Sequence, residues 1–144
     1  MQSEKKCQRH IWLLTGTGEG LPIAKALIEE GWRVTISVVT YQASLLYRDL
    51  PLEDLKIGPL NGVEGIVKNL NKSRLVHKGY EWVIDATHPF AEVISNYLRN
   101  ACEDVGQPLL RFERPIEENV YGTLINRSTD LSFLNLKGER VLMA

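Results

Sequence analysis

The sequence predicts an α/β domain of the Rossmann-like type, built on a doubly wound parallel sheet. Short apolar runs alternate with segments of helical period over residues 11–112, which is the pattern of such a sheet. A glycine-rich turn at residues 16–20 joins the first apolar run to the first helical segment. The chain has 144 residues, 44% of them apolar, which suffices for one core but not for two full domains. We therefore predict one complete domain over residues 1–115 and only the start of a second α/β domain over residues 116–144.

The first elements form a strand–helix–strand unit. Residues 11–14 are continuously apolar and predict a buried strand. Apolar residues then recur at helical spacing over residues 21–28, and Gly31 suits the end of that helix. Residues 32–40 are rich in β-branched side chains and carry almost no charge, which predicts a second parallel strand that is covered on both faces.

The sequence predicts some of the later helices and strands more clearly than others. The most regular helix is predicted from Phe90 to Val105, where apolar residues repeat at helical spacing and Gly106 follows. Residues 140–143 resemble one further strand. The other expected elements are a weak helix over residues 41–50, a short strand over 55–60, a helix around 63–70, a polar loop over 71–79, and strands over 81–86 and 108–112.

Composition excludes several classes of function. Seventeen basic and eighteen acidic residues give a net charge of 17 − 18 = −1, so no basic excess favours nucleic acid or an anionic membrane. Cys7, Cys102, His10 and His77 lack metal-ligand spacing, so no metal site is expected. No apolar run approaches a signal peptide or the roughly 20 residues of a membrane span, and we expect a soluble cytoplasmic protein.

The glycine turn is the first candidate binding segment. Gly16, Thr17, Gly18 and Glu19 follow a strand and precede a helix, where glycines let the backbone approach a pyrophosphate and helix N–H groups favour its charge. The third glycine, Gly20, comes one residue earlier than in the usual dinucleotide fingerprint. Two alternatives stay open: the glycines could serve only a backbone with positive φ, and Glu19 could simply favour the first helical turn as an anion.

The end of the second strand is the next candidate. An enzyme that uses NAD usually places an acidic residue there on the adenosine ribose, whereas this chain has Ser37 and Thr40. Hydroxyl groups do not repel a 2′-phosphate, so NADPH is expected rather than NADH, and Arg48 could supply a positive charge. Alternatively, Ser37 and Thr40 merely suit the end of a strand.

A third candidate segment follows the strand over residues 81–86. Asp85, Thr87, His88 and Pro89 place an acid, a hydroxyl and an imidazole at a strand-to-helix turn, where open α/β sheets bind their ligands. This predicts His88 and Asp85 as catalytic residues. The alternative is that Asp85 or Thr87 caps the helix and that His88 is an ordinary turn residue.

Two arginines follow the next strand. Arg111 and Arg114 could bind substrate carboxylates through their planar guanidinium groups. Pairing of an arginine with Glu113 within the same segment is the alternative.

The order of these segments resembles the motif series of precorrin-6A and cobalt-precorrin-6A reductases, and the resemblance spans about residues 11–115. Its most specific part is the segment DATHPFA, followed by Ser95 and by RFERP. The segments that carry it are IWLLTGTGE at 11–19, TISVVT at 35–40, IGPL at 57–60, VIDATHPFA at 83–91 and LRFERP at 110–115.

The resemblance implies an enzyme that transfers hydride from NADPH to a conjugated double bond of a ring-contracted tetrapyrrole, late in the route to cobalamin. The cofactor carries the chemistry, and the protein orients it against the substrate. The residues implied are Gly16, Thr17, Gly18, Ser37 and Thr40 at the nucleotide, Asp85, Thr87, His88 and Pro89 at the nicotinamide and macrocycle, and Arg111 and Arg114 at peripheral carboxylates.

Two departures keep other functions open. Residues 41–44 lack a glycine often found there, and members of the family have a second α/β domain that helps form the substrate cleft. The alternatives are a nucleotide-binding module without catalysis and an inactive truncated fragment of such a reductase. The chain could also pair with a separate second domain or associate with itself through residues 141–143. A short-chain-dehydrogenase-like enzyme is set aside because no Tyr-x-x-x-Lys pair is present.

Overall fold

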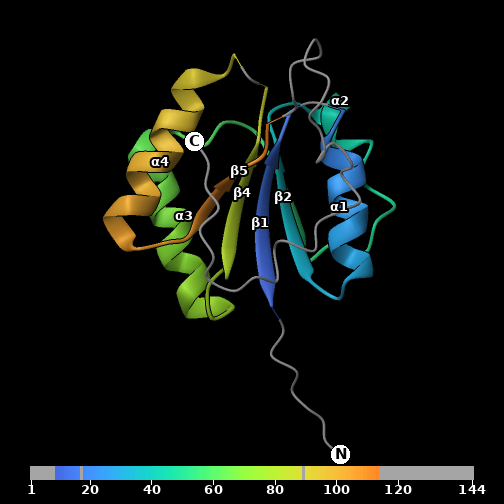
Figure 1. Cartoon of the computed structure of the whole chain (residues 1–144), viewed down its shortest axis with the longest axis horizontal. Helices are drawn as coiled ribbons and strands as arrows, with labels where there is room; N and C mark the ends of the chain where they lie inside the picture. Colours follow the sequence, from blue (N-terminus) through green and yellow to red (C-terminus); the bar gives the residue numbers. More distant parts are fainter. Residues whose placement is uncertain (1–8, 17, 89, 114–144) are drawn as a thin grey trace, which may run out of the picture.

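A parallel sheet follows from the alternation of strands and helices, because each helix returns the chain to the amino end of the next strand. The computed structural model describes residues 9–16, 18–88 and 90–113, and these form five parallel strands with helices on both faces (Figure 1). The predicted doubly wound α/β fold is confirmed. The elements are β1 (His10–Thr15), α1 (Gly20–Glu29), β2 (Arg33–Val38), α2 (Tyr41–Ser44), β3 (Asp54–Ile57), α3 (Gly62–Val76), β4 (Trp82–Ala86), α4 (Glu92–Val105) and β5 (Leu109–Arg111).

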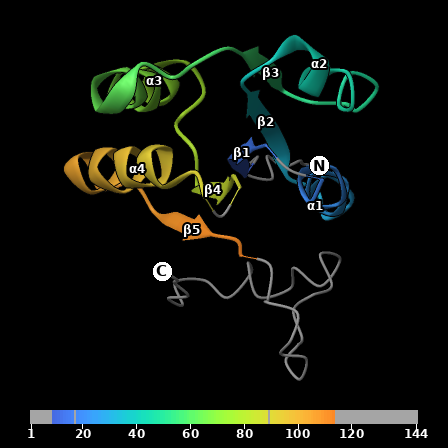
Figure 2. The same cartoon turned by 90° about the horizontal axis from the view of Figure 1, so that it is seen from above.

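Strand β1 lies at the centre of the sheet. The strand order is β3-β2-β1-β4-β5, so the chain winds outward from β1 to β3 and then crosses back through α3 to β4. Helices α3 and α4 cover one face, and α1 lies on the other (Figure 2). The direction of winding therefore changes between β1 and β4, and ligands of open α/β sheets bind at the carboxyl ends of such a pair.

The strands divide their side chains between two apolar cores. On β1, Ile11 and Leu13 face α1, while Trp12 and Leu14 face α3 and α4. All six residues of β1 are buried, as expected for a central strand covered on both faces. The α1 core also contains Ile23, Ala24, Leu27, Val34, Ile36 and Ile84, and the other core contains Ile66, Leu70, Val83, Leu98, Ala101 and Cys102.

The prediction of a polar loop over residues 71–79 is wrong for most of that segment, because α3 continues to Val76. Its buried side extends one turn beyond Leu70, the last buried apolar residue, to Ser73, whose hydroxyl donates to the Leu70 carbonyl at 2.8 Å. Arg74 also donates to the Val105 carbonyl of α4 at 2.8 Å. This polar segment is thus helical with its buried hydroxyl, that of Ser73, hydrogen-bonded within α3, and with Arg74 bonded to the neighbouring helix α4.

Two other expectations need correction. The helix predicted over residues 41–50 is only the single turn α2, and the hydrogen bonds that follow it, such as Leu46 N–H to the Ala43 carbonyl and Tyr47 N–H to the Ser44 carbonyl, span three residues rather than four. The helix predicted from Phe90 begins two residues later, at Glu92, and its predicted apolar residues are partly exposed, with Phe90 at 84% and Val93 at 64%. The buried side of α4 instead includes a polar residue, Ser95, together with Leu98, Ala101 and Cys102.

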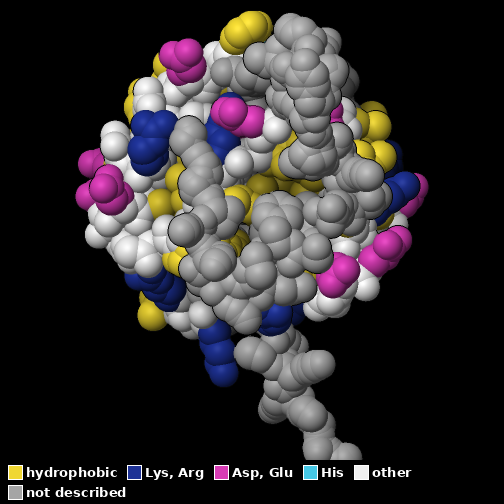
Figure 3. Space-filling view, viewed as in Figure 1, with side chains coloured by type: hydrophobic (Ala, Val, Ile, Leu, Met, Phe, Trp, Pro, Cys, Tyr) yellow, Lys and Arg dark blue, Asp and Glu magenta, His cyan; other side chains and the backbone are white. Residues whose placement is uncertain are grey.

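Some predictions fall outside the described residues. These are the start of a second domain over residues 116–144, the strand over 140–143, and association through 141–143. Within the described ranges, no helix combines the length and apolar character needed to cross a bilayer. Acidic and basic side chains are interspersed around the visible surface of the described residues (Figure 3), in keeping with the net charge near zero.

A buried histidine lies at the amino end of the sheet. His10 is 2% exposed, its Nε2 lies 2.8 Å from the Thr35 hydroxyl, and its ring contacts those of His77 and Tyr80. Burial lowers the pKa of His10 to about 4, with a further contribution from the positive charge of Arg33. The imidazole is therefore neutral in the folded protein at physiological pH.

This burial predicts a loss of stability in mild acid. The unfolded His10 titrates near 6.5 and the folded one near 4, so between these values the unfolded state binds more protons and stability falls as the pH falls. The full effect is on the order of 3 kcal/mol. We expect urea unfolding midpoints of wild type to fall between pH 6.5 and pH 4.5, and His10→Gln to flatten this dependence. His88→Gln, which removes an exposed histidine, serves as the control, and an unchanged slope in His10→Gln would contradict the prediction.

Candidate functional site

The candidate residues meet at the carboxyl ends of neighbouring strands. In the sheet, Leu14 of β1 pairs with Ser37 of β2 on one side and with Asp85 of β4 on the other, and Asp85 pairs with Arg111 of β5. Thr15, which leads into the glycine turn, pairs with Ala86, which leads into the turn after β4. The two turns therefore extend from adjacent strands at the point where the winding changes direction.

Among the described residues, no close contact requires the first two residues of the turn to be glycine. A Cβ added to Gly16 or Gly18 would meet no atom of another described residue within 4 Å, chain neighbours aside. The backbone of Gly16 does not have a positive φ, so the alternative that a left-handed conformation requires it does not hold. What remains is the outer side of the turn, where a missing Cβ permits close approach by a ligand.

Gly20 has a different role. A Cβ at this position would collide with the Thr15 side chain and with the Tyr47 hydroxyl. Gly20 therefore allows α1 to pack closely on β1, which is the function of the third glycine in the dinucleotide fingerprint. The departure in spacing noted in the sequence thus preserves the packing role one residue earlier.

Tyr47 completes this contact and was missed by sequence analysis. It lies in the segment after α2 and is 2% exposed, and its hydroxyl lies 3.3 Å from the Thr15 hydroxyl. Burial raises the pKa of Tyr47, partly offset by the hydrogen bond with Thr15. No local motif could reveal this partnership, because the two residues are 32 positions apart.

The hydroxyl residues near the end of β2 have partners within the protein. Ser37 is buried and accepts a hydrogen bond from the Trp12 indole at 2.8 Å. Thr40 caps α2 by accepting from the Ala43 N–H at 3.1 Å. The alternative that these residues suit the strand end and the next helix is thus observed, although each hydroxyl retains its own proton to donate. Glu19 stands at the N-terminal cap of α1 without a side-chain capping bond.

Asp85 is the centre of a buried network at the end of β4. It is 1% exposed, and its Oδ1 accepts from the Thr87 hydroxyl at 2.6 Å and from the Thr87 N–H at 3.1 Å. Its Oδ2 accepts from the Ser95 hydroxyl at 2.6 Å and from Arg111 Nη1 at 2.8 Å. The sequence showed Ser95 only as part of a motif and gave no sign that it joins Asp85.

Arg111 belongs to the same network rather than to the open surface. Its side chain is 14% exposed, and Nη1 also donates to the Ser95 hydroxyl at 2.7 Å. Its Nε donates to Glu113 at 3.2 Å, which is the pairing considered as an alternative. Burial acts to lower the pKa of Arg111, but the carboxylates of Asp85 and Glu113 outweigh it and raise the pKa above its usual value.

His88 is exposed beyond this network. Its Nδ1 accepts from the Phe90 N–H at 3.1 Å, and the two rings lie 5.1 Å apart. Because Nδ1 accepts, the neutral ring carries its proton on Nε2, which is available as a donor. The predicted residues Thr17, Pro89 and Arg114 lie outside the described residues. Nowhere in the described ranges does a group of three His, Cys, Asp or Glu side chains form a potential metal site.

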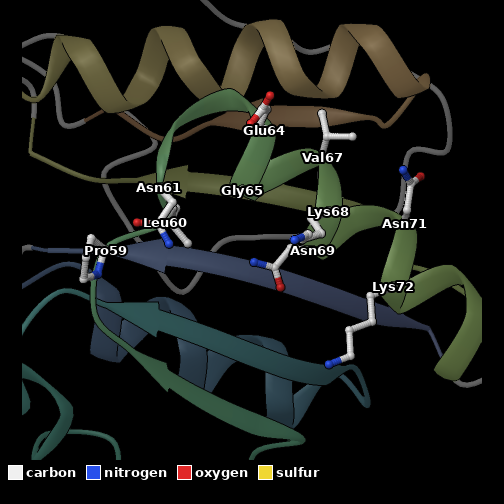
Figure 4. A pocket seen from close by; sticks show the side chains of 10 residues that line it. All are labelled: Pro59, Leu60, Asn61, Glu64, Gly65, Val67, Lys68, Asn69, Asn71 and Lys72. Atoms are coloured by element: carbon white, nitrogen blue, oxygen red, sulfur yellow. The ribbon is translucent and has the colours of Figure 1, made fainter.

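A pocket elsewhere does not coincide with these residues. It has a volume of about 670 Å³ and lies along α3 and the residues just before it (Figure 4). Its charged residues Lys68, Lys72 and Glu64 belong to an exposed helix face, and it contains no predicted site residue. The pocket is lined by Pro59, Leu60, Asn61, Glu64, Gly65, Val67, Lys68, Asn69, Asn71 and Lys72.

Comparison with known sequences identifies the family. The profile of the family described as Precorrin-6x reductase CbiJ/CobK matches residues 10–144. The chain belongs to this family. Among its relatives, the precorrin-6A reductase of Mycobacterium tuberculosis is 31% identical over 131 residues, which are 90% of this chain and 49% of that protein. The precorrin-6A reductase of Rhodobacter capsulatus is 35% identical over 102 residues, or 71% of this chain and 38% of that protein.

One further relative and one solved structure carry the names of the same kind of reductase. The cobalt-precorrin-6A reductase of Synechocystis sp. is 30% identical over 105 residues, covering 73% of this chain and 38% of that protein. A solved structure of CobK precorrin-6A reductase matches 74% of this chain and 38% of its own, with a TM-score of 0.60 and 34% identity. The chain thus spans about half the length, or less, of the precorrin-6x reductase relatives that it matches.

The contrast between the glycines predicts different effects on stability. Gly20→Ala should lower the free energy of unfolding by about 1–3 kcal/mol, because the new methyl group meets Thr15 and Tyr47. Gly16→Ala should change it by less than about 0.5 kcal/mol, because its methyl group enters open space. Chemical denaturation of both variants measures the difference, and equal losses would refute the close packing at Gly20.

Proposed function

We propose that the chain forms the NADPH-binding part of a reductase that reduces a double bond of precorrin-6A or cobalt-precorrin-6A in cobalamin biosynthesis. The observation that carries this proposal is the glycine turn at the switch point of the sheet, where the described residues leave open space beside Gly16 and Gly18 near the N-terminus of α1. Membership of the precorrin-6x reductase family supports the reaction class.

The residues present fit a dinucleotide. The backbone of Gly16, Thr17 and Gly18 would approach the pyrophosphate, and the N-terminus of the ten-residue helix α1 would favour its negative charge. Glu19 would lie at the edge of this turn. Thr87 and Pro89 would border the nicotinamide from the adjacent strand β4.

The adenosine side favours NADPH over NADH. No acidic residue occurs between Val38 and Tyr41, where an NAD-specific enzyme would bind the ribose hydroxyls with a carboxylate. The hydroxyls of Ser37 and Thr40 can still donate a proton each, and the exposed Arg48 would add positive charge toward the 2′-phosphate.

The nicotinamide would supply hydride, and the protein would orient it against the acceptor carbon. His88 presents its Nε2 proton from an exposed position and would donate a hydrogen bond to a carbonyl or carboxylate of the tetrapyrrole. Arg114 would bind a peripheral carboxylate, as a planar guanidinium group does well. These roles assign the substrate to the side of the turn that follows β4.

A second candidate is a nucleotide-binding module without turnover. The glycine turn supports this function too, because open space beside Gly16 and Gly18 among the described residues serves nucleotide binding whether or not hydride transfer follows. Saturable NADPH binding without hydride transfer to the tetrapyrrole would select this function.

Titration of the purified chain with NADPH and NADH, followed by nicotinamide fluorescence, tests the proposal. We expect NADPH to bind at least about tenfold more tightly than NADH, and Gly18→Asp to abolish binding, because it places a carboxylate beside the pyrophosphate. Asn71→Asp, which adds the same charge on the outer side of α3, should bind as wild type does. Absence of binding to both nucleotides would overturn the proposed function, and turnover of the tetrapyrrole would separate the two candidates.

A further inference from the structure

We propose that Asp85, Ser95 and Arg111 form a clamp that positions the turn between β4 and α4 for the nicotinamide half of the cofactor. This inference rests on the proposed function. It assigns these residues a positioning role, whereas the sequence predicts Asp85 as catalytic and Arg111 as a substrate ligand. Neither residue then needs to touch the substrate.

The carboxylate of Asp85 has no acceptor capacity left for a substrate. A carboxylate offers about four lone-pair sites. Two are taken by the hydroxyl and N–H of Thr87, one by Ser95 and one by Arg111. An aspartate so occupied, at 1% exposure, is suited to hold its neighbours rather than to exchange a proton with a ligand.

The clamp joins three elements through a closed triangle of hydrogen bonds. Arg111 of β5 donates to both Asp85 of β4 and Ser95 of α4, and Ser95 donates to Asp85. The Phe112 N–H adds a backbone bond to the Asp85 carbonyl at 2.9 Å. Because all three side chains are largely buried, removing one partner leaves polar groups without water or protein to satisfy them.

The clamp acts on the turn through Thr87. Both hydrogen-bond donors of Thr87 are directed to the same oxygen of Asp85, which fixes the backbone immediately before His88. On the other side, His88 is held by the Phe90 N–H. Thr87, His88 and Phe90 are thus held by bonds within the protein before any ligand binds, which lowers the entropic cost of binding.

The first test compares two ligands in Ser95→Ala. NADPH reaches the turn after β4 with its nicotinamide, whereas 2′-phospho-ADP-ribose lacks that ring. We expect Ser95→Ala to weaken NADPH binding about five- to tenfold, the effect of one lost hydrogen bond, and to leave 2′-phospho-ADP-ribose unchanged. The matched control is Ser73→Ala, which removes a buried hydroxyl from α3 and should alter neither ligand.

The second test needs no nucleotide. Amide hydrogen exchange at Thr87 and Phe90 should accelerate at least about tenfold in Ser95→Ala and remain as in wild type in Ser73→Ala. Equal weakening of both ligands, or unchanged exchange in the turn, would overturn the positioning role. Failure of the wild type to bind either ligand would instead overturn the proposed function, and the exchange rates would still show whether the clamp orders the turn.

Discussion

Burial of the central strand β1 is the constraint on which the rest of the structure depends. Its two edges are paired with β2 and β4, and its two faces are covered by α1 on one side and by α3 and α4 on the other. A strand enclosed in this way can meet a ligand only at its ends, and open α/β sheets bind their ligands at the carboxyl end. Close packing at Gly20 keeps α1 near that end, so the first helical N–H groups and the turn after β4 become neighbours of the same open edge.

Polar residues are concentrated on one face of the sheet, and each requires a partner. Toward α3 and α4, Ser37 is paired with Trp12, and Asp85 is paired with Thr87, Ser95 and Arg111. His10, at the amino end of the same face, accommodates burial differently, by remaining neutral. These groups restrict the possible arrangements of α3 and α4, because an apolar contact tolerates small shifts better than a buried hydrogen bond does.

Most of the fold could be predicted from the sequence, because apolar period and glycine positions are local properties. Strand β1, the glycine turn and α1 follow directly from them, as does the end of α4 at Gly106. For the site, the sequence predicted which turns contribute residues but not which side chains contact one another. The contacts of Asp85 with Ser95 and Arg111 join residues 10 and 26 positions apart, and that of Thr15 with Tyr47 joins residues 32 apart. Such partners become visible only when the sheet order is known, since no local period records them.

The two turns at the open edge differ in how they meet a ligand. Gly16 and Gly18 carry no side chains, and no described residue beyond their chain neighbours comes within 4 Å of where a Cβ would stand, so a charged group can approach their backbone directly. The turn after β4 is held by its own hydrogen bonds, and among its described residues His88 and Phe90 are exposed. A ligand that spans both turns would gain most of its binding free energy at the first turn and its orientation at the second. This division suits hydride transfer, because affinity for the phosphates then does not depend on the geometry that aligns the nicotinamide with its acceptor.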